Sequence, residues 1–235
     1  VTTRDALLPA GLAAVALTVL VYVWLSRGRG ESGRAAGILA ALFLATFPAF
    51  FGQARSAEMD MLLALLVALS FWAYERHRTE GWRPALPIFY LALGLGILVK
   101  GHAILIVVLP VLLAWHNWER PGIAVPASPR RSWVLHLLGL GLLLLVVLPW
   151  AIPFLQRSGI TWSDFYREGV DRFDEDTGHQ EAWYFYLLNV PAWTLPLFLL
   201  LPFAAWRQWK SPEDGDSPRR RLWWLWFGVN LLLWS

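Results

Sequence analysis

The chain has 235 residues, of which 57% are hydrophobic and only 16% are charged, and its mean hydropathy is +0.47. A soluble domain carries about 25% charged residues, so this composition excludes an ordinary soluble protein and indicates a membrane protein. The formal net charge of +3 says little, because in membrane proteins the placement of charge carries the information. Cysteine is absent, which excludes disulfides, thiolate metal sites and a cysteine nucleophile. No basic cluster is interleaved with stacking aromatic residues, so no nucleic-acid partner is expected.

Apolar runs recur along the whole chain, and a spanning helix needs about 20 predominantly apolar residues. The stretch 84–115 is apolar apart from Lys100-Gly101-His102 at its middle, which predicts two short helices meeting at a break. The expected fold is all-α, a single polytopic transmembrane helical bundle over residues 1–235 with about eight spans. The other predicted spans are 7–25, 35–51, 61–74, 133–154, 183–206 and a run that starts near residue 222.

Basic residues alternate between the two sides of these spans. The connectors 26–34, 75–83, 116–132 and 207–221 hold 14 of the 20 lysines and arginines. Cytoplasmic loops retain basic residues, so these connectors are predicted to be cytoplasmic. The remaining connectors then face outward, and they carry Arg55, Lys100 and a long polar loop.

That outer-face loop covers residues 156–182 and is predominantly acidic. A charged, aromatic loop of this length between membrane spans is usually functional rather than a simple connector. Glu168, Asp171, Arg172 and His179 could bind a polar group or a divalent ion, although no ligand spacing marks a metal site. The alternative is a solvated charged surface.

A second polar segment on the same side joins the predicted spans 35–51 and 61–74. It carries Arg55, Glu58 and Asp60 close to the hydrocarbon boundary, where charge is costly and is usually paired or used. The guanidinium fork of arginine suits a phosphate group. The alternative is a plain polar turn in which Ser56 or Asp60 caps the next helix.

Lys100 allows two interpretations as well. A cation is favoured at the C-terminal end of a helix, and Gly101 is a typical helix stop. Alternatively, a lone lysine on the outer side could hold the phosphate of a lipid carrier as a point charge.

Several of these segments resemble the family 39 glycosyltransferases. These are GT-C membrane enzymes that include the aminoarabinose transferase of lipid A and relatives of the protein O-mannosyltransferases. The run GQARSAEMDMLL at 52–63 resembles the family's "AR…DM" junction, and GLGILVKG at 94–101 resembles its "GLAFLTKGP" segment. Pro149-Trp150, Glu168 to Phe173, His179 and Trp183-Tyr184 follow its "PW…EHxxRF…H…PWWYY" pattern. Gly169 departs from that pattern, because a histidine is common there.

The resemblance implies a membrane glycosyltransferase that moves a sugar from a polyprenyl-phosphate-linked donor to a lipid or protein acceptor. It implies an integral, multi-pass protein of the bacterial inner membrane whose active face points to the periplasm or exterior. The catalytic acid is expected in an upstream outer loop that this chain lacks together with the first helix, so no catalytic residue is assigned. No metal or cofactor is assigned, and a divalent cation stays an alternative. The donor phosphate is expected to bind Arg55, Lys100 and Arg172, supported by Glu58, Asp60, Glu168 and His179.

Two other classes stay as alternatives. A secondary transporter would also contain a broken helix pair and lone charges, but its site should lie near the midplane between repeated halves. No internal repeat is evident in this sequence. A non-catalytic polytopic membrane protein would not need the outer-face loop.

Overall fold

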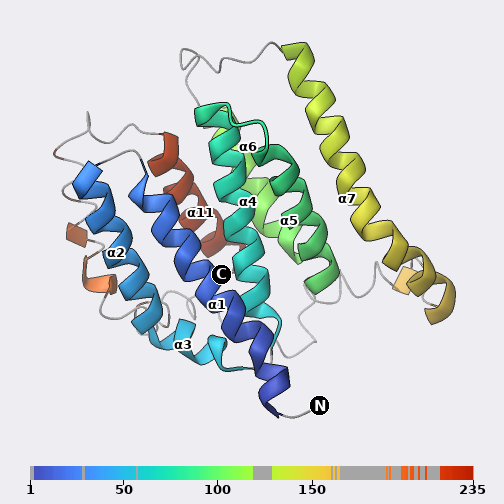
Figure 1. The fold of residues 1–235 in the computed structure, drawn as a ribbon, viewed down its shortest axis with the longest axis horizontal. Helices are drawn as coiled ribbons and strands as arrows, with labels where there is room; N and C mark the ends of the chain where they lie inside the picture. The colour runs from blue at the N-terminus through green and yellow to red at the C-terminus, as the bar shows by residue number, and fades with distance from the viewer. Residues whose placement is uncertain are drawn as a thin grey trace.

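The computed structural model describes residues 3–27, 30–56, 58–118, 129–159, 161, 163–164, 189, 191, 197–200, 202–203, 206, 210 and 218–234. All regular structure within these residues is helical, with eight α-helices and one short 3-10 helix, η2, at Leu197–Leu200. The all-α prediction is confirmed (Figure 1). Most of the predicted span 183–206 lies outside the described residues.

The first two helices, α1 (Thr3–Ser26) and α2 (Gly30–Thr46), lie antiparallel and in close contact. Gly37 allows this approach, because a Cβ there would overlap the Ser26 side chain and lie 2.8 Å from the Tyr22 carbonyl oxygen. Small residues that let helix backbones approach are typical of membrane helix pairs.

The predicted span 35–51 is not one straight helix. It is divided between α2 and the short helix α3 (Pro48–Ala54), whose axes differ by 66°. Phe47 is extended, with φ −70° and ψ 120°, as expected for a residue that precedes a proline. The prediction of a single span missed this bend.

The next three helices form the centre of the bundle: α4 (Asp60–Glu80), α5 (Ala85–Lys100) and α6 (Ala103–Trp118). Their contact surfaces bury Phe71, Leu86, Ile104 and other apolar side chains. The predicted span 61–74 is the N-terminal part of α4, which continues to Glu80 and is followed by Gly81 with a φ of +66°. A left-handed glycine at this position is a common helix stop.

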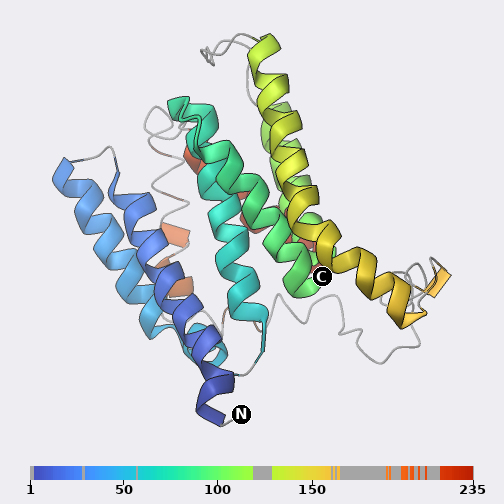
Figure 2. The same ribbon diagram turned by 45° about the vertical axis from the view of Figure 1, so that its right-hand side comes forward.

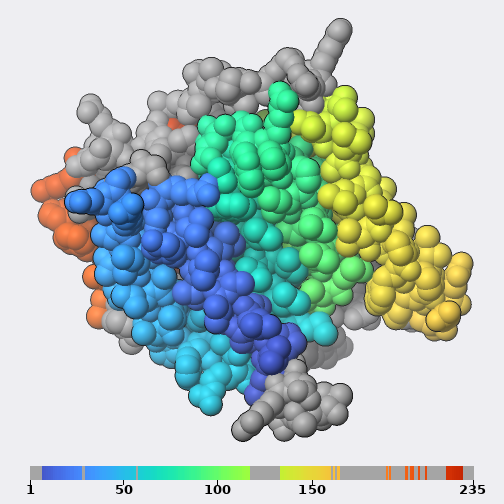
Figure 3. All heavy atoms as spheres, viewed as in Figure 1, coloured from blue at the N-terminus to red at the C-terminus, as the bar shows by residue number. Residues whose placement is uncertain are grey.

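Two further helices pack on this centre. The helix α7 (Pro129–Ser158) lies against α5, and α11 (Pro218–Trp234) lies against α6. Trp223 of α11 contacts Trp24 of α1, with 4.7 Å between ring centroids. Pro149 and Pro153 lie inside α7, and its last turns bend away from the bundle (Figure 2). The helix forms one edge of the molecule in Figure 3, and many of its apolar side chains are exposed.

Only some of the apolar helices are long enough to cross a membrane. Leu7–Ser26 and Trp133–Ser158 are each long and apolar enough to cross a membrane, and the bent α2–α3 pair is a third candidate. The helices α5 and α6 are apolar but have only 16 residues each. At 1.5 Å per residue each is about 24 Å long, shorter than a hydrocarbon core of about 30 Å.

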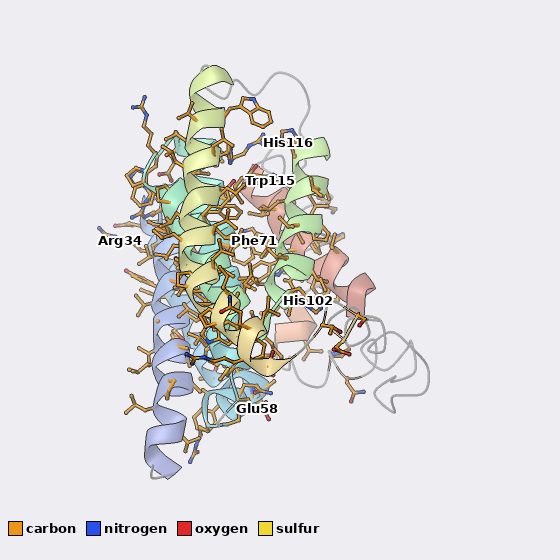
Figure 4. All side chains as sticks on the ribbon, turned by 90° about the vertical axis from the view of Figure 1, so that its right-hand side faces the viewer. Arg34, Glu58, Phe71, His102, Trp115 and His116 are labelled. Atoms are coloured by element: carbon orange, nitrogen blue, oxygen red, sulfur yellow. The ribbon has the colours of Figure 1, made fainter. Side chains whose placement is uncertain are left out.

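The long helices α1, α2, α4, α5, α6 and α7 alternate in direction (Figure 1), so the connectors between them gather at two ends of the bundle. We call one the arginine-rich end, and its described arginines include Arg27, Arg34, Arg76, Arg78 and Arg83. The other, the Lys100 end, carries Arg55, Glu58, Asp60 and Lys100. Figure 4 shows Trp115 and His116 toward the first end and Glu58 and His102 toward the second.

Candidate functional site

The break predicted between two short helices lies where α5 ends. Lys100 is the last residue of α5, and the Gly101 N–H donates to the Ile97 carbonyl oxygen over 2.8 Å. Gly101 adopts φ +61° and ψ −136°, a conformation that is open almost only to glycine. The chain can therefore turn back at once into α6. Gly101 is the helix stop that the sequence predicts.

Lys100 contacts an acidic residue from the neighbouring helix. Its Nζ donates a hydrogen bond to Oδ1 of Asp60, the first residue of α4. Because α4 and α5 are antiparallel neighbours, the N-terminus of α4 lies beside the C-terminus of α5. Each charge also complements its own helix dipole, with the carboxylate at an N-terminus and the ammonium at a C-terminus.

This ion pair remains accessible from outside the bundle. The Lys100 and Asp60 side chains are 46% and 42% exposed. An ammonium group has three N–H donors, so the contact with Asp60 leaves two for another acceptor. A bound anion could therefore accept a hydrogen bond from Lys100 while Lys100 stays in contact with Asp60.

Arg55 follows α3 at the same end of the bundle. Its side chain is exposed, and its guanidinium carbon lies 5.2 Å from the centre of the Phe51 ring. Among the described residues Arg55 forms no ion pair. The Phe51 ring restrains the Arg55 side chain, and no carboxylate among the described residues neutralises its charge.

The capping alternative for this segment is wrong. The helix α4 is preceded by Met59, which makes no side-chain capping bond. The Ser56 hydroxyl instead bonds the Gln53 carbonyl oxygen at 3.2 Å and the Gln53 side chain at 3.1 Å. The Asp60 carboxylate contacts Lys100 rather than the start of its own helix.

The other predicted residues are placed differently. Glu58 is exposed in the connector before α4 and forms no ion pair among the described residues. Arg172, Glu168 and His179 lie outside the described residues. The phosphate-binding role of Arg55, Lys100 and Arg172 therefore stays a prediction, and so does the supporting role of the acids.

No group of three or more histidine, aspartate or glutamate side chains in the described part of the chain could hold a metal ion. Because Glu168 and His179 are not among those residues, the divalent-cation alternative stays open.

Two features of this end were missed from the sequence. The partnership of Lys100 and Asp60 has no local signal, since it depends on which helices are neighbours. The second feature is a capping box at the start of the outer-face loop, where the Thr161 N–H donates to Asp164 Oδ2 over 2.8 Å. The spacing T-x-x-D, with an acid three residues after a threonine, could have predicted it.

The fold and the charged end define a class: a helical membrane protein with exposed cationic side chains where its apolar helices end. Residues 7–162 match the profile of the family described as dolichyl-phosphate-mannose-protein mannosyltransferase, and the chain belongs to this family.

Several relatives have a more specific name, undecaprenyl phosphate-alpha-4-amino-4-deoxy-L-arabinose arabinosyl transferase. The protein of this name from Pseudomonas aeruginosa strain LESB58 is 31% identical over 91% of the chain and 39% of its own length. One from Pseudomonas fluorescens strain Pf0-1 is 30% identical over 90% of the chain and 38% of its own length. One from Erwinia tasmaniensis is 27% identical over 90% and 38%. The chain thus spans less than two fifths of these relatives' length, and no solved structure matches it.

Proposed function

We propose that this chain is part of a membrane glycosyltransferase and holds the phosphate of a polyprenyl-phosphate-linked sugar donor. The observation that carries the proposal is the exposed Lys100–Asp60 ion pair at the end of the bundle that also carries Arg55. Membership of the mannosyltransferase family and the names of the relatives support the class of reaction and the class of donor.

The site suits a lipid-linked phosphate for a physical reason. Lys100 and Arg55 lie where apolar helices end, so a polyprenyl chain can stay in the hydrocarbon while its phosphate reaches the cations. Two N–H groups of Lys100 and the guanidinium of Arg55 then serve as donors. Asp60 orients Lys100, and Arg172, Glu168, Glu58 and His179 complete the site in this proposal.

In the reaction, the bond between the anomeric carbon of the sugar and the phosphate oxygen breaks. Its electron pair stays on the carrier phosphate, while the acceptor oxygen bonds to the anomeric carbon and loses its proton to a base. Cations held beside the phosphate stabilise the charge that develops on it, which is commonly the largest contribution to such catalysis. No residue of this chain is assigned as that base.

The relatives' names favour an aminoarabinose donor on undecaprenyl phosphate. We place the reaction at the outer face of a bacterial inner membrane, because the outer side is where the distribution of basic residues puts Lys100. The acceptor is a lipid or protein. A transporter is less favoured, because its charges should lie near the membrane midplane rather than at helix ends.

The test is donor binding to the full-length enzyme. Lys100→Met and Arg55→Met each remove a charge-assisted hydrogen bond worth about 1.5–3 kcal/mol, so donor affinity should fall by roughly 10- to 150-fold. Lys100→Arg should retain more affinity than Lys100→Met. Arg34→Met, at the arginine-rich end, is the matched control and should bind like the wild type. Equal donor affinity in wild type and in both Lys100→Met and Arg55→Met proteins would refute the proposal.

A further inference from the structure

Two tryptophans and two arginines form a cluster at the arginine-rich end, far from Lys100. Trp72 of α4 and Trp82 of the α4–α5 turn meet edge to face, with ring centroids 5.8 Å apart. The Arg76 guanidinium carbon lies 4.1 Å from the centre of the Trp82 ring and 5.4 Å from that of Trp72. Arg27, immediately after α1, lies 5.9 Å from the Trp72 ring. We call these four residues the Trp–Arg cluster.

The cluster carries a positive charge that is only half neutralised. Arg76 is paired, because its Nε and Nη2 both donate to Glu80 Oε2, at 2.9 and 2.7 Å. Arg27 is exposed and has no carboxylate partner among the described residues. Its guanidinium presents five N–H donors and is always protonated.

The two tryptophan rings form the inner part of this cluster. The Trp72 Nε1 atom is buried and has no hydrogen-bond partner in the described part of the chain. Both tryptophan rings pack against the hydrophobic core, which holds them in place. A buried N–H without an acceptor is costly. Because this atom is buried, the donors of the cluster that a headgroup can reach are those of Arg27.

The position of the cluster indicates which anion fits. It lies where α1 and α4 reach the end of the bundle, and tryptophan at such helix ends is typical of the headgroup level of a membrane. Phosphate oxygens accept hydrogen bonds at that depth, and guanidinium groups bind phosphate with directional bonds. We propose that the Trp–Arg cluster binds the phosphate headgroup of an anionic phospholipid from the leaflet opposite to the Lys100 end.

This site is distinct from the proposed donor site, since it lies at the other end of the bundle and shares no residue with it. Its partner is a structural lipid of the bilayer rather than a substrate. The lipid-binding proposal does not involve sugar transfer, so either this proposal or the proposed function can be wrong without the other.

The experiment measures lipid binding to the purified full-length protein in detergent. Short-chain phosphatidylglycerol and phosphatidylcholine are titrated separately, and retained lipid is counted by native mass spectrometry. The wild type should prefer phosphatidylglycerol. Arg27→Gln should weaken that binding about fivefold, the value for one basic residue at an anionic surface. Trp72→Leu, which removes the ring that Arg27 packs against, should weaken it about two- to fivefold.

Arg34→Gln is the matched control, because Arg34 is an exposed arginine at the same end on α2 and is not part of the cluster. It should bind like the wild type. An equal loss of phosphatidylglycerol binding in Arg34→Gln and Arg27→Gln would show diffuse charge attraction and overturn the proposed site. Equal affinity for phosphatidylglycerol and phosphatidylcholine would overturn it as well. Displacement of phosphatidylglycerol by an equal concentration of inorganic phosphate would overturn the lipid assignment. Arg27→Lys, which keeps the charge, should bind more tightly than Arg27→Gln and guards against misfolding of the glutamine variant.

Discussion

Lys100 and Asp60 are 40 residues apart in the sequence, yet the Lys100 ammonium donates a hydrogen bond to the Asp60 carboxylate. The contact exists because α4 begins beside the point where α5 ends. Any phosphate that binds Lys100 therefore meets a lysine that is already held by a carboxylate. The exposure of the pair also limits its contribution to folding, since exposed ion pairs contribute about 0–1 kcal/mol.

The orienting role of Asp60 can be tested with two substitutions in the full-length enzyme. Asp60→Asn keeps an oxygen acceptor for Lys100, whereas Asp60→Ala removes it. If Asp60 orients Lys100, donor affinity should decrease in the order wild type, Asp60→Asn, Asp60→Ala. The free energy of unfolding should change by no more than about 1 kcal/mol in either variant.

If Asp60 merely competed with the donor phosphate for Lys100, the same variants would bind the donor more tightly than the wild type. A double-mutant cycle with Lys100→Met separates the two roles. The effect of Asp60→Ala on donor affinity should disappear once Lys100 is absent. An unchanged effect would show that Asp60 acts independently of Lys100.

Gly101 should be sensitive to substitution for its backbone conformation alone. A Cβ at this residue would meet nothing within 4 Å, but its φ of +61° is unfavourable for any side chain. Gly101→Ala should cost about 1–3 kcal/mol in the free energy of unfolding. Gly52→Ala is the control, because Gly52 is helical and its Cβ also meets nothing within 4 Å. A Gly101→Ala protein as stable as wild type would contradict the assigned backbone geometry.

The contact between α5 and α7 should be sensitive to a side chain at Gly139. A Cβ at Gly139 would overlap the Tyr90 ring, whereas one at Gly141, two residues along the same helix, would meet nothing within 4 Å. Gly139→Ala should therefore destabilise by about 1–3 kcal/mol through overpacking. Gly141→Ala should be neutral or stabilising, because alanine favours a helix interior. Thermal unfolding in detergent measures both, and equal stability of the two variants would contradict the α5–α7 packing.

The membrane orientation can be tested by labelling single cysteines, since the chain has none of its own. Arg34→Cys and Arg83→Cys should react only from the cytoplasmic side. Glu58→Cys should react only from the outer side, as should Asp176→Cys in the outer-face loop. Labelling of Glu58→Cys and Arg34→Cys from the same side would overturn both the helix directions and the proposed outer-face site.

Much of the architecture could be predicted because its signals are local. Apolar runs indicated the helical bundle, and the Lys100-Gly101-His102 interruption indicated the break between α5 and α6. The bend at Pro48 also had a local signal, because a proline disfavours the helical conformation of the residue before it. The single predicted span 35–51 did not take this signal into account. The matching motifs were sufficient by themselves to indicate the family.

The contacts between helices could not be predicted from such local signals. Membrane helices are apolar on nearly all sides, so the period of their hydrophobic residues does not show which side faces a neighbour. The sequence by itself determined the helical membrane class, the break at Lys100-Gly101-His102, the alternation of basic residues and the family. Only the tertiary structure decided that Asp60 contacts Lys100 and that Arg27 lies beside Trp72. Both contacts depend on which helices are neighbours and how each is rotated about its axis, and close packing of side chains across the whole bundle decides that.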